Sequence, residues 1–202
     1  MVRGVPYDAT KRALFRAASA PDLFRLGRYA TQAAVCAELC RVAYLGTDRH
    51  LETVLSTAQL TLEAAISHGS GFAYVARREV PPFTALVFRG TSPDPRDLLT
   101  DIKFLPREWS PAGSVHRRFA DALDAMWRDI VAALPSADTP VVMTGHSLGG
   151  ALATLAASRR PNATLCTFGS PITRRSTTSR QRSAGAGTRY ATAEPRSYGD
   201  NG

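Results

Sequence analysis

The sequence lacks long hydrophobic runs and has few cysteines. No apolar run approaches the roughly 20 residues that a membrane-spanning helix needs, and the first ten residues do not have the charged-then-apolar layout of a signal peptide. We therefore expect no transmembrane segment, and the location is predicted only as cytoplasmic or unknown. The cysteines, Cys36, Cys40 and Cys166, are odd in number, whereas a secreted disulfide framework uses an even number, so we expect reduced thiols.

Apolar residues are also missing from the end of the chain. Residues 172–202 contain no Leu, Val, Met, Phe or Trp, so they cannot bury enough apolar surface to offset the entropy lost on ordering. They hold 6 Arg against two acidic residues, and this excess is half of the net charge of +8. We therefore predict one domain over residues 1–171 and a disordered polar tail over residues 172–202.

Hydrophobic periodicity predicts alternating helices and strands in the first part. Apolar residues recur every three or four positions in four expected helices, at 28–44, 51–66, 114–134 and 150–159, with Ser114 as the N-cap of the third. Short apolar runs predict strands at 72–77, 84–88, 140–144 and 163–168. The final strand–helix–strand succession predicts an α/β fold, with helices flanking a mostly parallel sheet.

A glycine-rich turn joins the expected strand at 140–144 to the helix that follows it. The residues Gly145-His146-Ser147-Leu148-Gly149 match the G-x-S-x-G pattern in its required context. In such a turn the serine projects from strained backbone, and the glycines leave out side chains that would collide with neighbouring elements. We predict that Ser147 is an exposed nucleophile and that the Leu148 N–H binds a developing oxyanion. The alternative is a glycine-rich helix cap without chemistry.

Motifs beyond this turn occur in a definite order along the chain. They are Val87–Thr91 followed by Asp97–Asp101, Val115-His116 with Phe119, Thr144–Ala153, and Cys166–Pro171. Together they resemble the class 3 lipase family, the fungal-lipase-like branch of the α/β-hydrolases, although Arg118 stands where that family usually has glycine. The resemblance implies an α/β-hydrolase fold, and it implies that Thr91 supplies a second oxyanion donor.

The resemblance also implies a reaction and a substrate class. It implies a serine hydrolase that cleaves carboxylic ester bonds of lipids, of the triacylglycerol lipase or carboxylesterase type, without metal or organic cofactor. A phospholipase or a short-chain esterase is the alternative, because acyl-chain selection depends on lid and pocket residues. The expected partner is a lipid or ester substrate, and transient contact with a lipid surface is compatible with this. Scattered arginines without a recognition motif do not indicate nucleic-acid binding.

The histidines do not fit the expected order of a catalytic triad. A nucleophilic serine needs a histidine base and an acid that orients it, in the chain order Ser, acid, His. His50, His68, His116 and His146 all precede Ser147. We expect His50 and His68 at the surface, His116 as a structural or capping residue, and His146 turned away from the serine. The base is therefore unknown.

The acid has two weak candidates, Glu194 and Asp200. The segment Arg189–Pro195 is similar to the family's acid-bearing segment. The family's later strands, acid and histidine would fall in the polar tail, whose Arg/Ser/Thr/Gly/Ala composition begins abruptly after Pro171. In the whole chain Arg outnumbers Lys 23 to 2, as GC-rich codons produce. We therefore hypothesise a C-terminally truncated or frameshifted domain that lacks its last strands. In that case the chain is a catalytically inactive lipase homologue with a basic tail.

Overall fold

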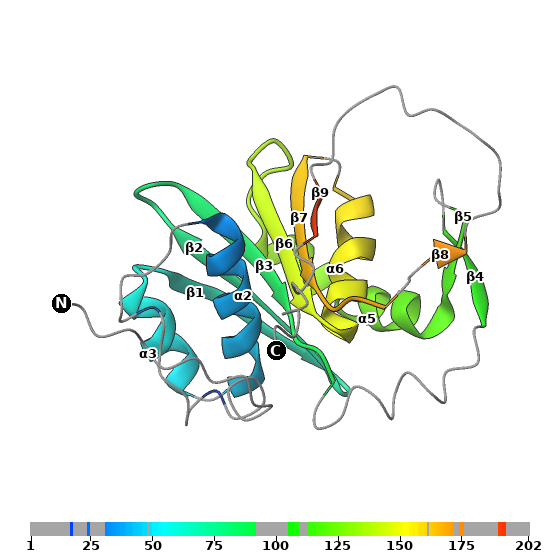
Figure 1. Ribbon diagram of the computed structural model, residues 1–202, viewed down its shortest axis with the longest axis horizontal. Helices are drawn as coiled ribbons and strands as arrows, with labels where there is room; N and C mark the ends of the chain where they lie inside the picture. Colours follow the sequence, from blue (N-terminus) through cyan, green and yellow to red (C-terminus); the bar gives the residue numbers. More distant parts are fainter. Residues whose placement is uncertain are drawn as a thin grey trace, which may run out of the picture.

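A six-stranded sheet forms the centre of the protein, and helices lie against both of its faces (Figure 1). This computed structural model describes residues 17, 24, 31–47, 49–91, 105–109, 113–160, 162–171, 174–175 and 190–192. In chain order its elements are α2 (Gln32–Val42), the short helix η3 (Ala43–Leu45), α3 (Arg49–Thr57), β1 (Thr61–His68), β2 (Gly71–Arg78), β3 (Phe83–Phe88), β4 (Pro106–Trp109), β5 (Gly113–His116), α5 (Arg117–Ala133), β6 (Val141–His146), α6 (Leu148–Ser158), β7 (Ala163–Phe168), β8 (Arg174–Arg175) and β9 (Tyr190–Thr192).

The sheet is mixed, and most of its strands point the same way. The strand order is β1-β2-β3-β6-β7-β9, in which β3, β6, β7 and β9 pair parallel and β2 runs antiparallel to both neighbours. Helix α5 connects towards β6, and α6 connects β6 to β7. The predicted α/β fold is confirmed. The carboxyl ends of β3, β6 and β7 meet at one edge, which is where ligands of parallel α/β sheets bind.

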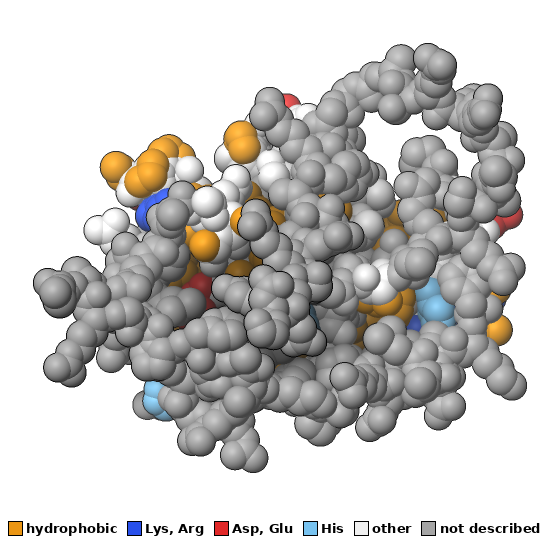
Figure 2. Space-filling model, in the orientation of Figure 1, with side chains coloured by type: hydrophobic (Ala, Val, Ile, Leu, Met, Phe, Trp, Pro, Cys, Tyr) orange, Lys and Arg blue, Asp and Glu red, His pale blue; other side chains and the backbone are white. Residues whose placement is uncertain are grey.

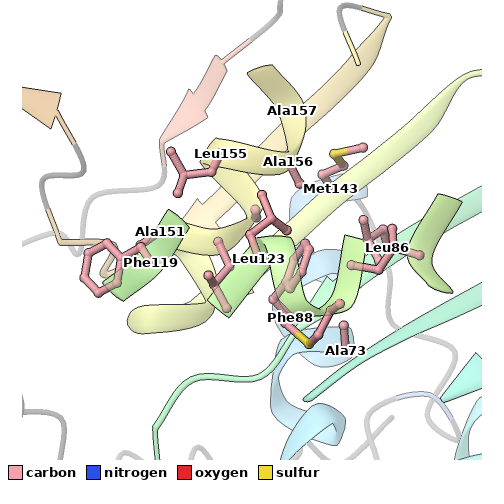
Figure 3. Packing of buried hydrophobic residues seen from close by; sticks show 14 of the residues in the cluster. Ala73, Leu86, Phe88, Phe119, Leu123, Met143, Ala151, Leu155, Ala156 and Ala157 are labelled. Carbon is pink, nitrogen blue, oxygen red and sulfur yellow. The ribbon is translucent and has the colours of Figure 1, made fainter. Parts of the chain in front are cut away.

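Different helices cover the two faces because successive strand residues point to opposite sides of a sheet. One face packs with α5 and α6 (Figure 3), through sheet residues that include Ala73, Val75, Leu86, Phe88 and Met143. The alternate residues pack on the other face with α2, η3 and α3, and they include Phe72, Tyr74, Ala76, Ala85 and Val87. The site edge is therefore held between two hydrophobic layers.

Helix α5 follows its predicted amphipathic pattern. Phe119, Leu123, Met126 and Ile130 recur at three- or four-residue spacing, and all four are buried against the sheet. Burial of one such side chain contributes about 1.5–3 kcal/mol. This stripe therefore accounts for the attachment of α5 to the sheet.

The helix predicted at 51–66 is wrong in its second half. α3 ends at Thr57, and residues 61–68 form β1, which pairs antiparallel with β2. The prediction relied on Leu62 and Ile66, which are four residues apart. That spacing places two residues on one side of a helix. In β1 they lie on opposite faces of the sheet, because a β-bulge between Leu62 and Ala64 shifts the register, so that Leu62 packs on the side of α2 and α3 and Ile66 on the side of α5 and α6. Pairing with β2 decides in favour of the strand.

The predicted N-cap of α5 is also wrong. Ser114 lies in β5, opposite Glu108 of β4, and the N-cap is His116. Serine is a favoured N-cap because its hydroxyl accepts a backbone N–H of the first turn. Here the β4–β5 ladder takes up the backbone of residue 114, and the Nδ1 atom of His116 accepts the N–H of Arg118 at 3.2 Å instead.

Two short strands lie in the segment for which composition predicted no ordered structure. β8 pairs with β5, and β9 pairs with β7, with Tyr190 opposite Leu165 and Thr192 opposite Thr167. Beyond Pro171 the described residues are those of these two strands, so the prediction of a disordered tail stays a prediction. The edge of a sheet presents backbone N–H and C=O groups that pair with an extended segment of any composition, so apolar side chains are not required.

The turn between β2 and β3 carries exposed apolar surface. Val80 is 79% exposed, and Pro81 and Pro82 beside it are also exposed. Figure 2 shows hydrophobic side chains gathered over this turn at the upper left. The turn precedes β3, so it lies at the edge of the sheet opposite the carboxyl ends of the parallel strands.

Among the described helices, none is both long and apolar enough to cross a membrane.

Candidate active site

Ser147 occupies the sharp turn between β6 and α6. Its backbone has φ 54° and ψ −125°, and a sparsely populated conformation of this kind costs a non-glycine residue about 1–3 kcal/mol. The N–H of Ser147 donates to the carbonyl oxygen of Phe168 in β7 at 2.9 Å, and its carbonyl oxygen accepts the N–H of Gly150 at 2.9 Å. Bonds to β7 and to the first turn of α6 thus hold the strained residue in place.

The two glycines of the motif sit where no side chain fits. A Cβ on Gly145 would lie 2.2 Å from the carbonyl carbon and oxygen of Gly149. A Cβ on Gly149 would lie 2.2 Å from the carbonyl oxygen of Phe88 in β3. In folded proteins, non-bonded contacts between a Cβ atom and another heavy atom are essentially never shorter than 3.0 Å. The predicted steric role of both glycines therefore agrees with the geometry.

Ser147 is less accessible than its motif predicts. We expected an exposed serine, but the residue is 5% exposed. The end of β3 explains the difference, because a Cβ on Gly90 would lie 3.4 Å from the Cβ of Ser147 and 2.5 Å from the carbonyl oxygen of His146. The serine is enclosed by neighbouring strand ends and does not stand clear above the sheet.

Two backbone segments flank Ser147 where the sequence predicts oxyanion donors. Leu148 is the first residue of α6, and the N–H of a first-turn residue has no partner within its helix. Thr91 follows Gly90 at the end of β3, and its Oγ1 is buried without a hydrogen-bond partner among the described residues. A buried polar atom left in this state costs about 1–3 kcal/mol. Both groups are therefore suited to meet an oxygen atom of a ligand.

His146 hydrogen-bonds to Tyr44, a residue that the sequence analysis did not single out. The Tyr44 hydroxyl lies 3.0 Å from Nδ1 of His146, and the two rings meet edge to face with centroids 6.2 Å apart. Burial lowers the pKa of His146 from its ordinary 6.5 and so favours the neutral ring. The residues are 102 positions apart, and no spacing in the sequence connects them.

The other three histidines are in positions that agree with their predicted non-catalytic roles. His116 caps α5 and stacks on Phe119 with ring centroids 4.8 Å apart, which agrees with the predicted capping role. His50 and His68 are exposed, as predicted. The described residues therefore assign no histidine as the base.

Comparison with known proteins decides the family. Residues 85–183 match the family model of the lipases of class 3. Through these 99 of its 202 residues, the chain is identified as carrying a class 3 lipase domain. The matched segment runs from β3 through the Ser147 turn and β7, so it contains both predicted oxyanion donors.

Individual relatives of this class 3 lipase domain are longer than the chain. A lipase of Rhizomucor miehei is 36% identical over 94 residues, which are 42% of this chain and 25% of that protein. The solved propeptide complex of Rhizomucor miehei lipase is 27% identical with a TM-score of 0.53, over 72% of this chain and 56% of that one. A solved triacylglycerol lipase whose catalytic centre is formed by a serine protease triad is 25% identical with a TM-score of 0.58, over 69% of this chain and 63% of that one.

The two acid candidates of the class 3 lipase domain, Glu194 and Asp200, lie outside the described residues. The nearest described element is β9, which ends at Thr192. Because β9 runs parallel to β7 and Thr192 lies opposite Thr167, β9 ends near the edge of the sheet that carries Ser147.

The three cysteines of the domain are buried and free. Cys36 and Cys166 share a small cluster with Val142, and the Sγ of Cys40 lies 3.2 Å from Oγ1 of Thr144 in β6. The predicted reduced state agrees with this arrangement. Among the described residues, no group of three or more His, Cys, Asp or Glu side chains is placed to hold a metal ion.

Proposed function

We propose that this class 3 lipase domain is a serine hydrolase that cleaves carboxylic ester bonds of lipids, with Ser147 as its nucleophile. The observation that carries the proposal is the strained turn at Ser147, which is flanked by the first N–H of α6 and by the end of β3 at Thr91. The lipases found by comparison support the substrate class and favour the triacylglycerol lipase or carboxylesterase type.

The proposed reaction is acyl transfer from an alcohol to water. A base takes the hydroxyl proton of Ser147 while its Oγ bonds to the ester carbonyl carbon, and the carbonyl oxygen becomes an oxyanion. The Leu148 N–H and the Thr91 N–H and hydroxyl stabilise that oxyanion. The C–O bond to the alcohol then breaks, and the alcohol leaves with the proton. Water attacks the acyl-serine by the same path and releases the acid.

We propose Glu194, in preference to Asp200, as the acid that orients the base. β9 ends near the sheet edge that carries Ser147, and Glu194 follows the last residue of β9 by two positions. Asp200 is eight positions beyond the strand. The base itself is not assigned to any of the four histidines.

The test is hydrolysis by the purified 202-residue chain, with matched serine variants. Ser147→Ala removes the nucleophile and should lower kcat about 10³-fold or more. Ser170→Ala is the control, because Ser170 adjoins the same turn, where its Oγ donates to the Pro171 carbonyl oxygen at 3.2 Å. This control should keep wild-type turnover. Glu194→Gln should reduce kcat, whereas Asp200→Asn should not.

The substrates separate the remaining alternatives. Tributyrin, long-chain triacylglycerol, p-nitrophenyl butyrate and phosphatidylcholine distinguish a lipase from a short-chain esterase and from a phospholipase. A p-nitrophenyl phosphonate should attach covalently to Ser147, which mass spectrometry detects. Turnover that survives Ser147→Ala would refute the assignment of the nucleophile. If the wild type shows no turnover and is not labelled by the phosphonate, the chain is a catalytically inactive homologue.

A further inference from the structure

The hydroxyl of Tyr44 lies between the two strand ends that lead into the oxyanion donors. It is 3.0 Å from Nδ1 of His146, the residue before Ser147. The same atom is 2.5 Å from the position that a Cβ on Gly90 would take, so it lies against the backbone just before Thr91. One hydroxyl therefore contacts both sides of the site.

The direct pairing of β3 with β6 stops short of these two strand ends. Parallel pairing between β3 and β6 ends with Phe88 opposite Gly145. Gly90 and His146 lie beyond this last pair, where the ladder of backbone hydrogen bonds no longer fixes the strands relative to each other. The hydroxyl of Tyr44 is placed where the ladder stops.

The protonation states of the two side chains suit a bridge at this point. Burial raises the pKa of Tyr44 to about 12, against the opposing effects of Arg89 and of a hydrogen bond with the Gly90 backbone, so the hydroxyl keeps its proton. Burial lowers the pKa of His146, so Nδ1 of the neutral ring can accept. The hydroxyl can thus donate to Nδ1 of His146 while its oxygen lies against the Gly90 backbone.

We propose that Tyr44 is a positioning residue of the oxyanion hole, whose hydroxyl fixes the spacing between the Thr91 and Leu148 donors by bridging Gly90 and His146. This role rests on the proposed hydrolase function. Donors stabilise an oxyanion only when they lie about 2.7–3.1 Å from it. A small shift of one strand end therefore weakens binding of the tetrahedral intermediate and leaves binding of the substrate unchanged.

The experiment compares Tyr44→Phe with Tyr74→Phe in the full chain. Tyr74 is the matched control, because its buried hydroxyl donates to the carbonyl oxygen of Leu39 in α2 at 2.8 Å. Both variants lose one tyrosine hydroxyl and a hydrogen bond between the sheet and the α2–η3 layer, but Tyr74 does not lie between the strand ends. Tyr44→Phe should lower kcat about tenfold or more with KM changed less than about twofold, because small displacements in a site reduce rate steeply. Tyr74→Phe should leave kcat within about twofold of the wild type.

A second measurement does not depend on turnover. Tyr44→Phe should move the amide signals of Thr91 and Leu148 in ¹H–¹⁵N spectra, and Tyr74→Phe should leave them in place. Equal losses of kcat in both variants, or unmoved amide signals in Tyr44→Phe, would overturn the positioning role. A wild type without Ser147-dependent turnover would refute the hydrolase function instead, and the amide signals would still decide whether Tyr44 sets the position of the two donors.

Discussion

Gly145→Ala tests whether the turn at Ser147 depends on the close contact between β6 and α6. The added Cβ would lie 2.2 Å from the carbonyl carbon and oxygen of Gly149 and 2.7 Å from the backbone nitrogen of Gly150. Ordinary van der Waals contact begins at 3.4 Å, so the overlap with Gly149 exceeds 1 Å. All three atoms belong to the backbone of the first helical turn. They cannot move aside without shifting α6 against the sheet.

The expected cost follows from this rigidity. Extra methyl groups forced into a well-packed site cost about 1–3 kcal/mol, and we expect the upper end because no flexible side chain can yield. For a chain of this size, a loss of 1 kcal/mol lowers Tm by about 2–4 °C. Gly145→Ala should therefore lower Tm by about 6–12 °C, which thermal unfolding followed by circular dichroism measures.

Gly69→Ala provides the control for this substitution. Gly69 has φ +55°, and a Cβ there would meet no heavy atom within 4 Å. The substitution therefore has only the conformational cost of a left-handed residue, about 1–2 kcal/mol. Gly145 does not have a positive φ, so its cost comes from contact alone. A Tm for Gly145→Ala equal to or above that of Gly69→Ala would refute the steric account of the turn.

Two further predictions concern groups away from the turn. Burial raises the pKa of Asp124, but hydrogen bonds from Arg159 and Arg107 outweigh it and hold the pKa below its ordinary 3.8. The ionised Asp124 contributes about 0.5–1 kcal/mol to the free energy of unfolding above pH 3.8, and this contribution is lost as the pH falls through the folded pKa. The free energy of unfolding of Asp124→Asn should therefore fall less with acidification than that of the wild type. Burial raises the pKa of Cys40 to about 12, so Ellman's reagent at pH 8 should label Cys40 and Cys36 only after unfolding, and fast labelling of the native protein would contradict their burial.

The strands that build the site edge were predictable from the sequence because their signals are local. β3, β6 and β7 are short apolar runs bounded by proline or glycine, and each was predicted within two residues of its bounds at either end. The turn at Ser147 was predictable because its two glycines are required by contacts with the adjacent strand and helix. In both cases the physical cause lies within a few residues of the signal.

The elements that were missed depend on partners distant in the chain. Thr61–His68 becomes a strand because β2 pairs with it, and β9 forms because β7 offers an open edge. The low accessibility of Ser147 likewise depends on the close approach of Gly90, which comes from another strand. Periodicity and composition report what a segment prefers, but these three features were decided by what each segment meets.

The place of Tyr44 follows from a match between helix and strand geometry that becomes visible only in three dimensions. Cys36 packs with Val142, the Sγ of Cys40 lies 3.2 Å from Oγ1 of Thr144, and the hydroxyl of Tyr44 lies 3.0 Å from Nδ1 of His146. The helical positions advance by four residues while the strand positions advance by two. Four helical residues rise about 6 Å and two strand residues about 6.6 Å, so the contacts stay in step along β6. Packing of α2 near the centre of the sheet therefore sets where the Tyr44 hydroxyl meets the strand end beside Ser147.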